Sequence, residues 1–195
     1  MHTQHNNALT IGFVGGLRYF DINKRIIDIF GNSEEYNLLY VGKKHPGCDL
    51  EEYSLAKKIS NIKFMPAYDN DDKPKIYENI DIINSVYGND TAEVCTALPN
   101  KLYDAVLYKK PIMVSAGTYL QEVVDEYCLG LAVDLDKDDI EDELACFLSG
   151  FDKCLFYEGC ERFLKIALEE KGEMLKQVDE FIKGMCRSIA NECDS

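Results

Sequence analysis

Two glycines and three basic residues stand close together near the amino terminus. Gly15 and Gly16 follow an apolar run, and Arg18, Lys24 and Arg25 come shortly after them. Glycines let a ligand approach the backbone closely, and the N–H groups at the start of a helix favour anions. Because a guanidinium together with an ammonium suits a diphosphate, this segment predicts a phosphate-binding turn. The alternatives are a purely structural turn for the glycines and surface solvation for Lys24 or Arg25.

A second segment, PNKLYDAV, offers a carboxylate to the same kind of ligand. It begins at Pro99 and carries Asp104. Proline favours the first turn of a helix, so we expect a helix to start here with Asp104 about one turn inside it. A carboxylate beside a ligand crevice can accept two hydrogen bonds from the vicinal hydroxyls of a ribose. The alternative is that Asp104 only complements the helix dipole.

These residues must be positioned by the elements between them, and the pattern of those elements predicts an α/β fold. Short apolar or β-branched runs alternate with helical patterns up to about residue 150. We expect strands at residues 9–15, 37–42, 61–64, 80–84, 111–115 and 131–134. We expect helices at residues 22–30, 50–59, 75–78, 100–108, 119–127 and 138–149. Six strands in this alternation predict a doubly wound, Rossmann-like parallel sheet of order 3-2-1-4-5-6, with the ligand crevice at the carboxyl ends of the strands.

The chain divides into a polar start, one domain and a tail. We assign residues 1–8 to a flexible segment, 9–152 to the Rossmann-like domain and 153–195 to a helical tail. In the tail, apolar residues recur at helical spacing, and we expect Gly172 and Gly184 to break or bend the helix. We expect the tail to pack on the same domain. The alternative is that part of it crosses to a missing domain.

Composition excludes several classes of protein. Hydrophobic residues make up 46% and charged residues 29% of the chain, which fits a globular protein rather than a disordered, collagen-like or membrane-spanning one. No apolar run approaches the roughly 20 residues needed to cross a bilayer, and the amino terminus does not resemble a signal peptide, so we expect a cytoplasmic location. The net charge of −14 opposes binding to nucleic acid. The eight cysteines form no CxxC pair, which favours free thiols and no metal site.

Several segments, taken in order, resemble one known family. They are GFVGGLRYF, NIKF, PNKLYDAVLYKKPIMVS, GTYLQEVV and LGLAVD. Together they resemble the carboxy-terminal domain of the retaining glycosyltransferases of family 4, and the resemblance covers residues 9 to about 150. It implies one half of a GT-B architecture of two facing Rossmann-like halves. In that architecture this half binds a nucleoside-diphosphate sugar, and the amino-terminal half, absent here, holds the acceptor.

The resemblance also implies roles for particular residues. Arg18 and Lys24 would neutralise the departing diphosphate, which is usually the largest catalytic contribution in such a transfer. Asp104 stands at the second glutamate of the family's E-x7-E motif, which holds the ribose. The first glutamate falls on Thr96, with Glu93 near it but out of register, so recognition of the donor sugar departs from the family pattern. The donor-binding residues implied are Gly15, Gly16, Ala67, Tyr68, Thr96, Pro99, Asn100, Lys101 and Asp104.

The loop that holds Ala67 and Tyr68 corresponds to the place where the family binds the base. Tyr68 would stack on the base or fill the core as an ordinary aromatic residue.

The function implied is a hexosyltransferase-type glycosyltransferase, incomplete without a partner domain or subunit. It would use a nucleotide sugar, need no metal or other cofactor, and serve cell-surface polysaccharide synthesis, with peripheral membrane association arising through the partner. The alternatives are a nucleotide-binding module without transfer activity and a sugar-nucleotide epimerase-like domain. A dinucleotide-dependent oxidoreductase is least favoured, because Gly12, Gly15 and Gly16 lack the GxGxxG spacing.

Overall fold

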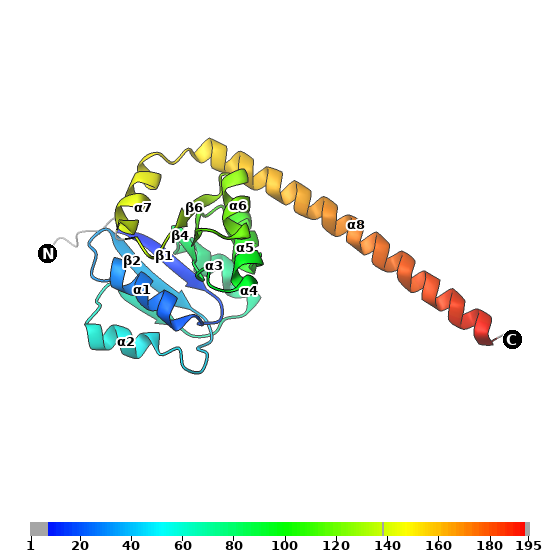
Figure 1. The fold of residues 1–195 in the computed structure, drawn as a ribbon, viewed down its shortest axis with the longest axis horizontal. Coiled ribbons are helices and arrows are strands. Elements are labelled where there is room, and N and C mark those ends of the chain that lie inside the picture. Colours follow the sequence, from blue (N-terminus) through cyan, green and yellow to red (C-terminus); the bar gives the residue numbers. More distant parts are fainter. Residues whose placement is uncertain (1–7, 138, 194–195) are drawn as a thin grey trace.

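A six-stranded parallel sheet forms the centre of the protein (Figure 1). The structure is a computed structural model that describes residues 8–137 and 139–193, with side chains described as far as Lys183. The strands are β1 (Leu9–Val14), β2 (Tyr36–Val41), β3 (Ile62–Met65), β4 (Ile82–Ser85), β5 (Ile112–Ser115) and β6 (Gly130–Val133). Their order is β3-β2-β1-β4-β5-β6, and all neighbours pair in parallel. The predicted fold class and strand order are therefore confirmed.

The helices follow the predicted alternation, with one addition. They are α1 (Phe20–Phe30), α2 (Leu50–Lys57), α3 (Lys73–Glu78), α4 (Ala92–Thr96), α5 (Asn100–Tyr108), α6 (Tyr119–Glu126), α7 (Ile140–Ser149) and α8 (Lys153–Cys193). A 3-10 turn, η1 (Asn70–Asp72), precedes α3. The added helix, α4, is five residues long, too short for a helical period to show in the sequence. Residue 138, where the helix over residues 138–149 was expected to begin, lies outside the described residues.

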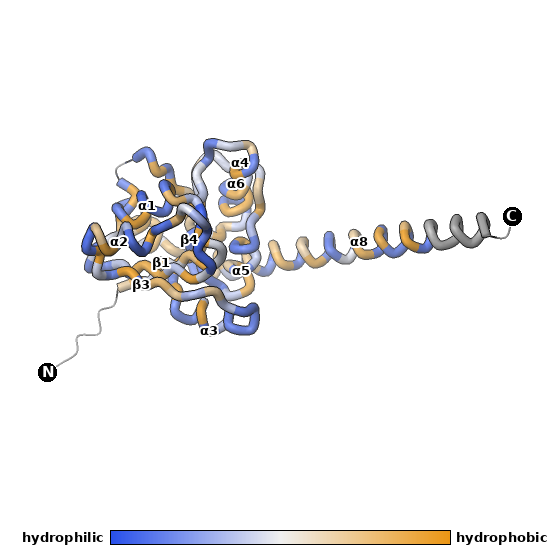
Figure 2. The backbone as a smooth tube through the Cα atoms, turned by 90° about the horizontal axis from the view of Figure 1, so that it is seen from below, coloured by the Kyte–Doolittle hydropathy of each residue, from blue (hydrophilic) through white to orange (hydrophobic). Residues whose placement is uncertain are grey.

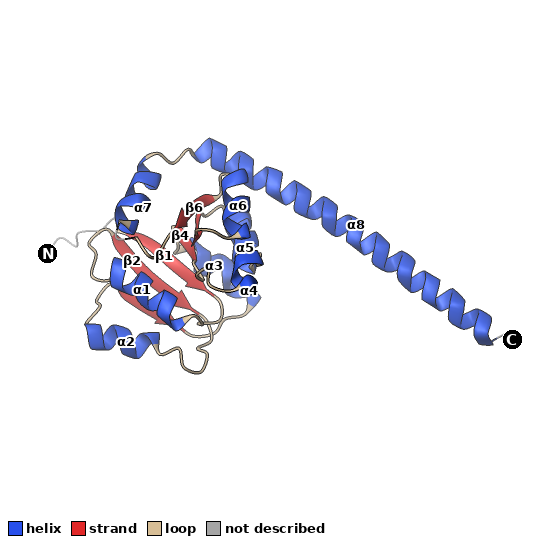
Figure 3. Ribbon diagram, in the orientation of Figure 1, coloured by secondary structure: helices blue, strands red, loops and turns tan. Residues whose placement is uncertain are grey.

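Helices cover both faces of the sheet (Figure 3), and two hydrophobic layers hold them there. Side chains of a strand alternate between the two faces, so Ile11 and Phe13 of β1 pack in the layer beneath α1, α2 and α7. Val14 points to the opposite layer, beneath α3, α5, α6 and the start of α8. Both faces are thus covered, as the near-continuous apolar strands require. The carboxyl ends of the strands are left to the loops.

The last helix, α8, leaves the domain after its first turns (Figures 1 and 2). Phe156, Cys160 and Phe163 are buried against the domain. Further along, Leu168 and Phe181 are 64% and 68% exposed. The expectation of a tail packed on the same domain therefore describes only the beginning of α8.

The predicted break at the two tail glycines is wrong. The helix runs without interruption from Lys153 to Cys193, through Gly172 and Gly184. A glycine in a helix costs only about 1 kcal/mol relative to alanine, and the glutamate, lysine and leucine residues around it favour helix. In the described part of the chain, no helix is both long and apolar enough to cross a bilayer.

Candidate functional site

The turn after β1 brings the backbone of two strands into contact. Gly15 has a φ of +138° and Gly42, at the same place after β2, a φ of +145°. A Cβ atom at Gly42 would lie 1.8 Å from the carbonyl oxygen of Gly15, so the two turns touch. The N–H of Gly15 donates to Val41 and that of Leu17 to Lys43, at 2.9 and 2.8 Å. We call residues 15–18 the glycine turn.

The glycine turn leads into α1 through a residue in the left-handed region. Tyr19 has a φ of 56°. The side chain of Asn23, 1% exposed, fixes this geometry by donating from Nδ2 to the carbonyl oxygens of Arg18 and Tyr19, at 2.8 and 3.1 Å. The side chain of Arg18 is exposed, with its guanidinium carbon 5.7 Å from the centre of the Tyr19 ring. Arg18 is therefore free to meet a ligand at the turn.

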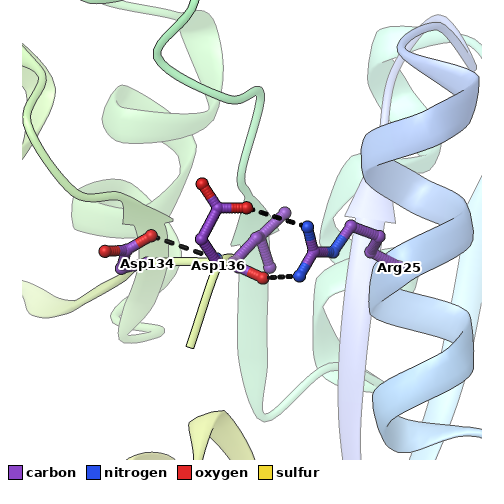
Figure 4. A network of polar contacts seen from close by, with 4 residues as sticks. Arg25, Asp134 and Asp136 are labelled. Carbon is purple, nitrogen blue, oxygen red and sulfur yellow. Dashed lines mark hydrogen bonds and ion pairs between the residues drawn. The ribbon is translucent and has the colours of Figure 1, made fainter. Parts of the chain in front are cut away.

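The other two basic residues of the segment are held elsewhere. The ammonium group of Lys24 lies 5.3 Å from the centre of the Tyr53 ring on α2. Arg25 forms an ion pair with Asp136 at 2.9 Å and donates to the carbonyl oxygen of Leu135 (Figure 4). The structure thus separates Arg18 from Lys24 and Arg25, although all three follow the same turn in the sequence.

Lys101 lies beside the glycine turn, where the sequence suggested Lys24 and Arg25. It belongs to α5, is 6% exposed, and donates from Nζ to the hydroxyl of Tyr87 at 2.8 Å. The same Nζ lies 3.7 Å from the centre of the Phe13 ring and 3.5 Å from the place that a Cβ atom of Gly15 would take. Lys101 therefore reaches the point between β1 and β4 where the strand order reverses, which is the ligand crevice of doubly wound sheets.

The charge of Lys101 depends on its surroundings. Burial lowers the pKa of its amine to about 7, and the neighbouring Arg18 and Lys73 act in the same direction while Asp104 opposes them. Its hydrogen-bond partner keeps its proton, because burial raises the pKa of Tyr87 to about 12. At neutral pH the glycine turn is therefore bordered by the guanidinium of Arg18 and by the amine of Lys101, which is only partly protonated.

Asp104 is already engaged by α3. Its two carboxylate oxygens each accept a hydrogen bond from Nζ of Lys73 at 2.9 Å, and Oδ2 also accepts from the hydroxyl of Tyr77 at 2.9 Å. The residue is 9% exposed. A carboxylate has about four lone-pair positions, and these donors use three of them, so a ribose that binds through both hydroxyls must displace one. Neither alternative from the sequence anticipated an ion pair here, and the ribose contact stays a prediction.

The loop after β3 borders a cavity of about 740 Å³. Met65, Pro66, Ala67 and Tyr68 line one end of it. The rest runs along β2, β3 and α3 to polar residues at the amino ends of the strands, among them Thr10, Asn37 and Asn61. Tyr68 is half-buried; burial raises its pKa, and Lys73 and Asp104 are close enough to affect it. The loop predicted to hold the base therefore lies next to Asp104 and its partner Lys73.

The segment before α5 departs most from the family pattern. The hydroxyl of Thr96 donates to the carbonyl oxygen of Ala92 within α4 at 2.8 Å, so it can only accept from a ligand. Glu93 is exposed in the first turn of α4. Pro99 directly precedes α5, and Asn100, the first residue of that helix, is exposed.

Sequence reasoning missed three residues that shape the site. Lys73 and Tyr77 bind Asp104, and Tyr87 binds Lys101. Tyr87 could have been found, because it follows β4 at the predicted crevice. Lys73 follows the acidic run 69–72, and no pattern marked it.

No model of a known protein family matches the chain. A search of curated proteins also finds no match.

Solved structures match over most of the chain. Anabaena Alr3699/HepE, in complex with UDP and glucose, is 14% identical, with 87% of this chain and 48% of that chain covered and a TM-score of 0.64. The lipopolysaccharide outer core galactosyltransferase WaaB is 14% identical, with 83% and 46% covered and a TM-score of 0.63. The C-terminal domain of LpcC, a glycosyl transferase group 1 family protein from Francisella tularensis, is 17% identical, with 78% and 80% covered and a TM-score of 0.51.

This chain spans about half the length of the HepE and WaaB chains. At these identities the likeness concerns the fold alone. The fold is that of one half of the GT-B glycosyltransferases, and LpcC shows it as a C-terminal domain.

Proposed function

We propose that this chain binds a nucleoside-diphosphate sugar at the carboxyl edge of its sheet and serves as the donor half of a glycosyltransferase. The observation that supports this proposal is that groups suited to a diphosphate, a ribose and a base lie next to one another along that edge. Arg18 acts electrostatically on Lys101, and Asp104 on both Lys101 and Tyr68. Diphosphate, ribose and base follow one another in a nucleotide in the same order as the glycine turn, Asp104 and the base loop.

Each part of the donor then has a partner in this chain. The backbone of Gly15 and Gly16 lets the diphosphate approach closely, and Arg18 neutralises the charge that develops as the diphosphate departs. Lys24 contributes only if its ammonium leaves the Tyr53 ring. Asp104 accepts the ribose hydroxyls. With cations supplied by side chains, we expect binding and transfer to need no metal ion.

The finer assignments follow from the resemblance to family 4. They are retention of the anomeric configuration, transfer of a hexose and a role in cell-surface polysaccharide synthesis at the cytoplasmic side. WaaB, a lipopolysaccharide outer core galactosyltransferase of similar fold, supports this choice of pathway class.

We propose that the acceptor is held by a second half, which docks on α8. Apolar residues on α8 beyond the domain are exposed: Leu168, Met174, Leu175, Val178, Phe181 and Ile182. Such an apolar row on a projecting helix is typical of an interaction surface. The chain covers 48% of HepE and 46% of WaaB, which leaves about one further domain for this surface to meet.

A panel of ligands tests the proposal. UDP, UDP-glucose, UDP-galactose, GDP-mannose and ADP-glucose are added to the 195-residue chain, and thermal unfolding is followed. A donor present at a hundred times its dissociation constant stabilises the fold by about 2.7 kcal/mol, so one class of base should raise the melting temperature clearly. The chain alone should transfer little or no sugar. Robust turnover by the chain alone contradicts the need for a second half.

A binding module without transfer activity is the second candidate. It is favoured by Thr96, which stands where the family has a glutamate, and by the ion pair that already occupies Asp104. Donor binding without turnover, even after an acceptor half has been added, would establish this alternative.

A further inference from the structure

The ammonium group of Lys101 lacks a negative partner although it is buried. Lysine is almost never fully buried unless it is paired, because an uncompensated buried charge is costly. Among the residues whose side chains are described, no carboxylate forms an ion pair with Lys101. Its Nζ has three donor positions, and the hydroxyl of Tyr87 accepts from one of them.

The unpaired group is aimed at the glycine turn. Nζ lies 3.5 Å from the place of a Cβ atom at Gly15, so the absence of a side chain there leaves the amine next to bare backbone. Arg18 stands at the end of the same turn, and its charge adds to the effect of burial in lowering the pKa of Lys101. Two cations that repel each other in the free protein therefore converge on one place, and an anion between them would stabilise both.

We propose that Lys101 is held unpaired inside the domain as the partner of the donor diphosphate, and that it takes up a proton when the donor binds. This inference rests on the proposed function and extends it, because it makes donor binding depend on pH through a single buried amine. The side chain of Lys101 would lie under the diphosphate, on the opposite side from the exposed guanidinium of Arg18.

The charged and titratable groups around the amine come from several elements. Arg18 follows β1 and Tyr87 follows β4. Lys73 is the first residue of α3, and Asp104 lies one turn along α5. Burial, Arg18 and Lys73 lower the pKa of Lys101 to about 7, and Asp104 opposes them. A bound diphosphate adds negative charge and raises that pKa again. Uptake of a proton is therefore small at pH 6, where the amine is already charged, and approaches one proton per donor at pH 8.

One more titratable group borders the turn. Nε2 of His45 lies 2.9 Å from the place of a Cβ atom at Gly16. A proton taken up by this imidazole has to be told apart from one taken up by Lys101. The variant His45→Gln is thus the matched control for Lys101→Met.

Calorimetry of UDP-glucose binding in buffers of different ionisation enthalpy measures the uptake directly. UDP-glucose is the probe because its diphosphate has no group that titrates between pH 6 and 8. For the unchanged chain we expect uptake to rise towards one proton between pH 6 and 8, with affinity about ten-fold weaker at pH 8 than at pH 6. Lys101→Met should abolish the uptake and weaken binding at pH 6 by about ten-fold or more. His45→Gln should leave both effects in place.

The unchanged chain decides the question even if Lys101→Met fails to fold. UDP-glucose binding without proton uptake at pH 8 overturns the role of Lys101 and leaves the proposed function intact. Uptake that disappears in His45→Gln also overturns it. If no nucleoside-diphosphate sugar binds at any pH, the proposed function fails and this inference fails with it.

Discussion

The ammonium group of Lys73 lies 2.9 Å from each of the two carboxylate oxygens of Asp104. The pair joins α3 to α5. Because the side chains are only 19% and 13% exposed, little water reaches it. A nucleotide that uses Asp104 must therefore share it with an existing partner. The structural and ligand-binding roles of this carboxylate can be measured separately.

Breaking this ion pair should destabilise the domain. Asp104→Asn leaves Lys73 without its counter-charge, and removal of one partner of a buried pair costs roughly 3 kcal/mol. Urea unfolding measures the loss for Asp104→Asn, for Lys73→Met and for the double variant. The double variant should be more stable than the sum of the two single losses implies. Strict additivity would mean that the two side chains do not interact.

The ribose role of Asp104 needs a comparison that is insensitive to this loss. We expect Asp104→Asn to weaken binding of UDP by about ten-fold, because hydrogen bonds to a charged group contribute about 1.5–3 kcal/mol. Binding of 2′,3′-dideoxy-UDP, which has neither hydroxyl, should change much less. Equal losses for the two ligands in isothermal titration would assign Asp104 to structure alone.

Arg18 should distinguish the diphosphate from the nucleoside. Arg18→Ala removes an exposed guanidinium from the glycine turn, so UDP should bind about ten-fold more weakly while uridine binding is unchanged. Arg25→Ala is the matched control, since Arg25 is bound to Asp136 and Leu135. Equal effects of the two substitutions on UDP affinity would contradict the assignment of Arg18.

The stability of the free protein should rise with pH above neutrality. The pKa of Lys101 is about 7 in the folded protein, below its ordinary value of 10.5. Between these values the unfolded chain binds more protons than the folded one, so unfolding becomes less favourable as pH rises. From pH 7 to 9 we expect a gain of roughly 2 kcal/mol in urea unfolding, which Lys101→Met removes. A flat profile for the unchanged chain would show that Lys101 is charged in the fold.

Two phenylalanines on α8 should behave in opposite ways. Phe163 is buried, with its ring centre 5.6 Å from that of Tyr103 and 5.4 Å from that of Tyr127, so Phe163→Ala should cost about 3–5 kcal/mol in unfolding. Phe181 is 68% exposed, and Phe181→Ala should change stability by less than about 0.5 kcal/mol. If α8 holds an acceptor half, Phe181→Ala should instead weaken that association. Its failure to do so would remove α8 from the interface.

The sequence predicted the sheet well and the side-chain directions poorly. The strands were found because each is a short apolar run between turn signals, and their order follows from regular alternation with helices. The directions of the basic side chains were harder to predict. Asn23 lies on the buried face of α1, so Lys24, 100° further round the helix, turns towards α2. Lys101 entered the sequence prediction only through the family resemblance, because no pattern in the surrounding sequence indicates that this lysine is buried.

Helix α8 fixes the geometry of whatever it carries. Phe151, in the three-residue link before α8, packs between Phe147 and Phe156 at ring distances of 5.5 and 5.3 Å, so the base of the helix is clamped. At 1.5 Å per residue, a helix of 41 residues extends for about 60 Å. Because the helix is so long, a small tilt at its base would move its far end by a much larger distance than the base itself moves. A body bound near Phe181 would therefore be held far from the sheet, and its position would depend on the packing of Phe151 at the base of α8.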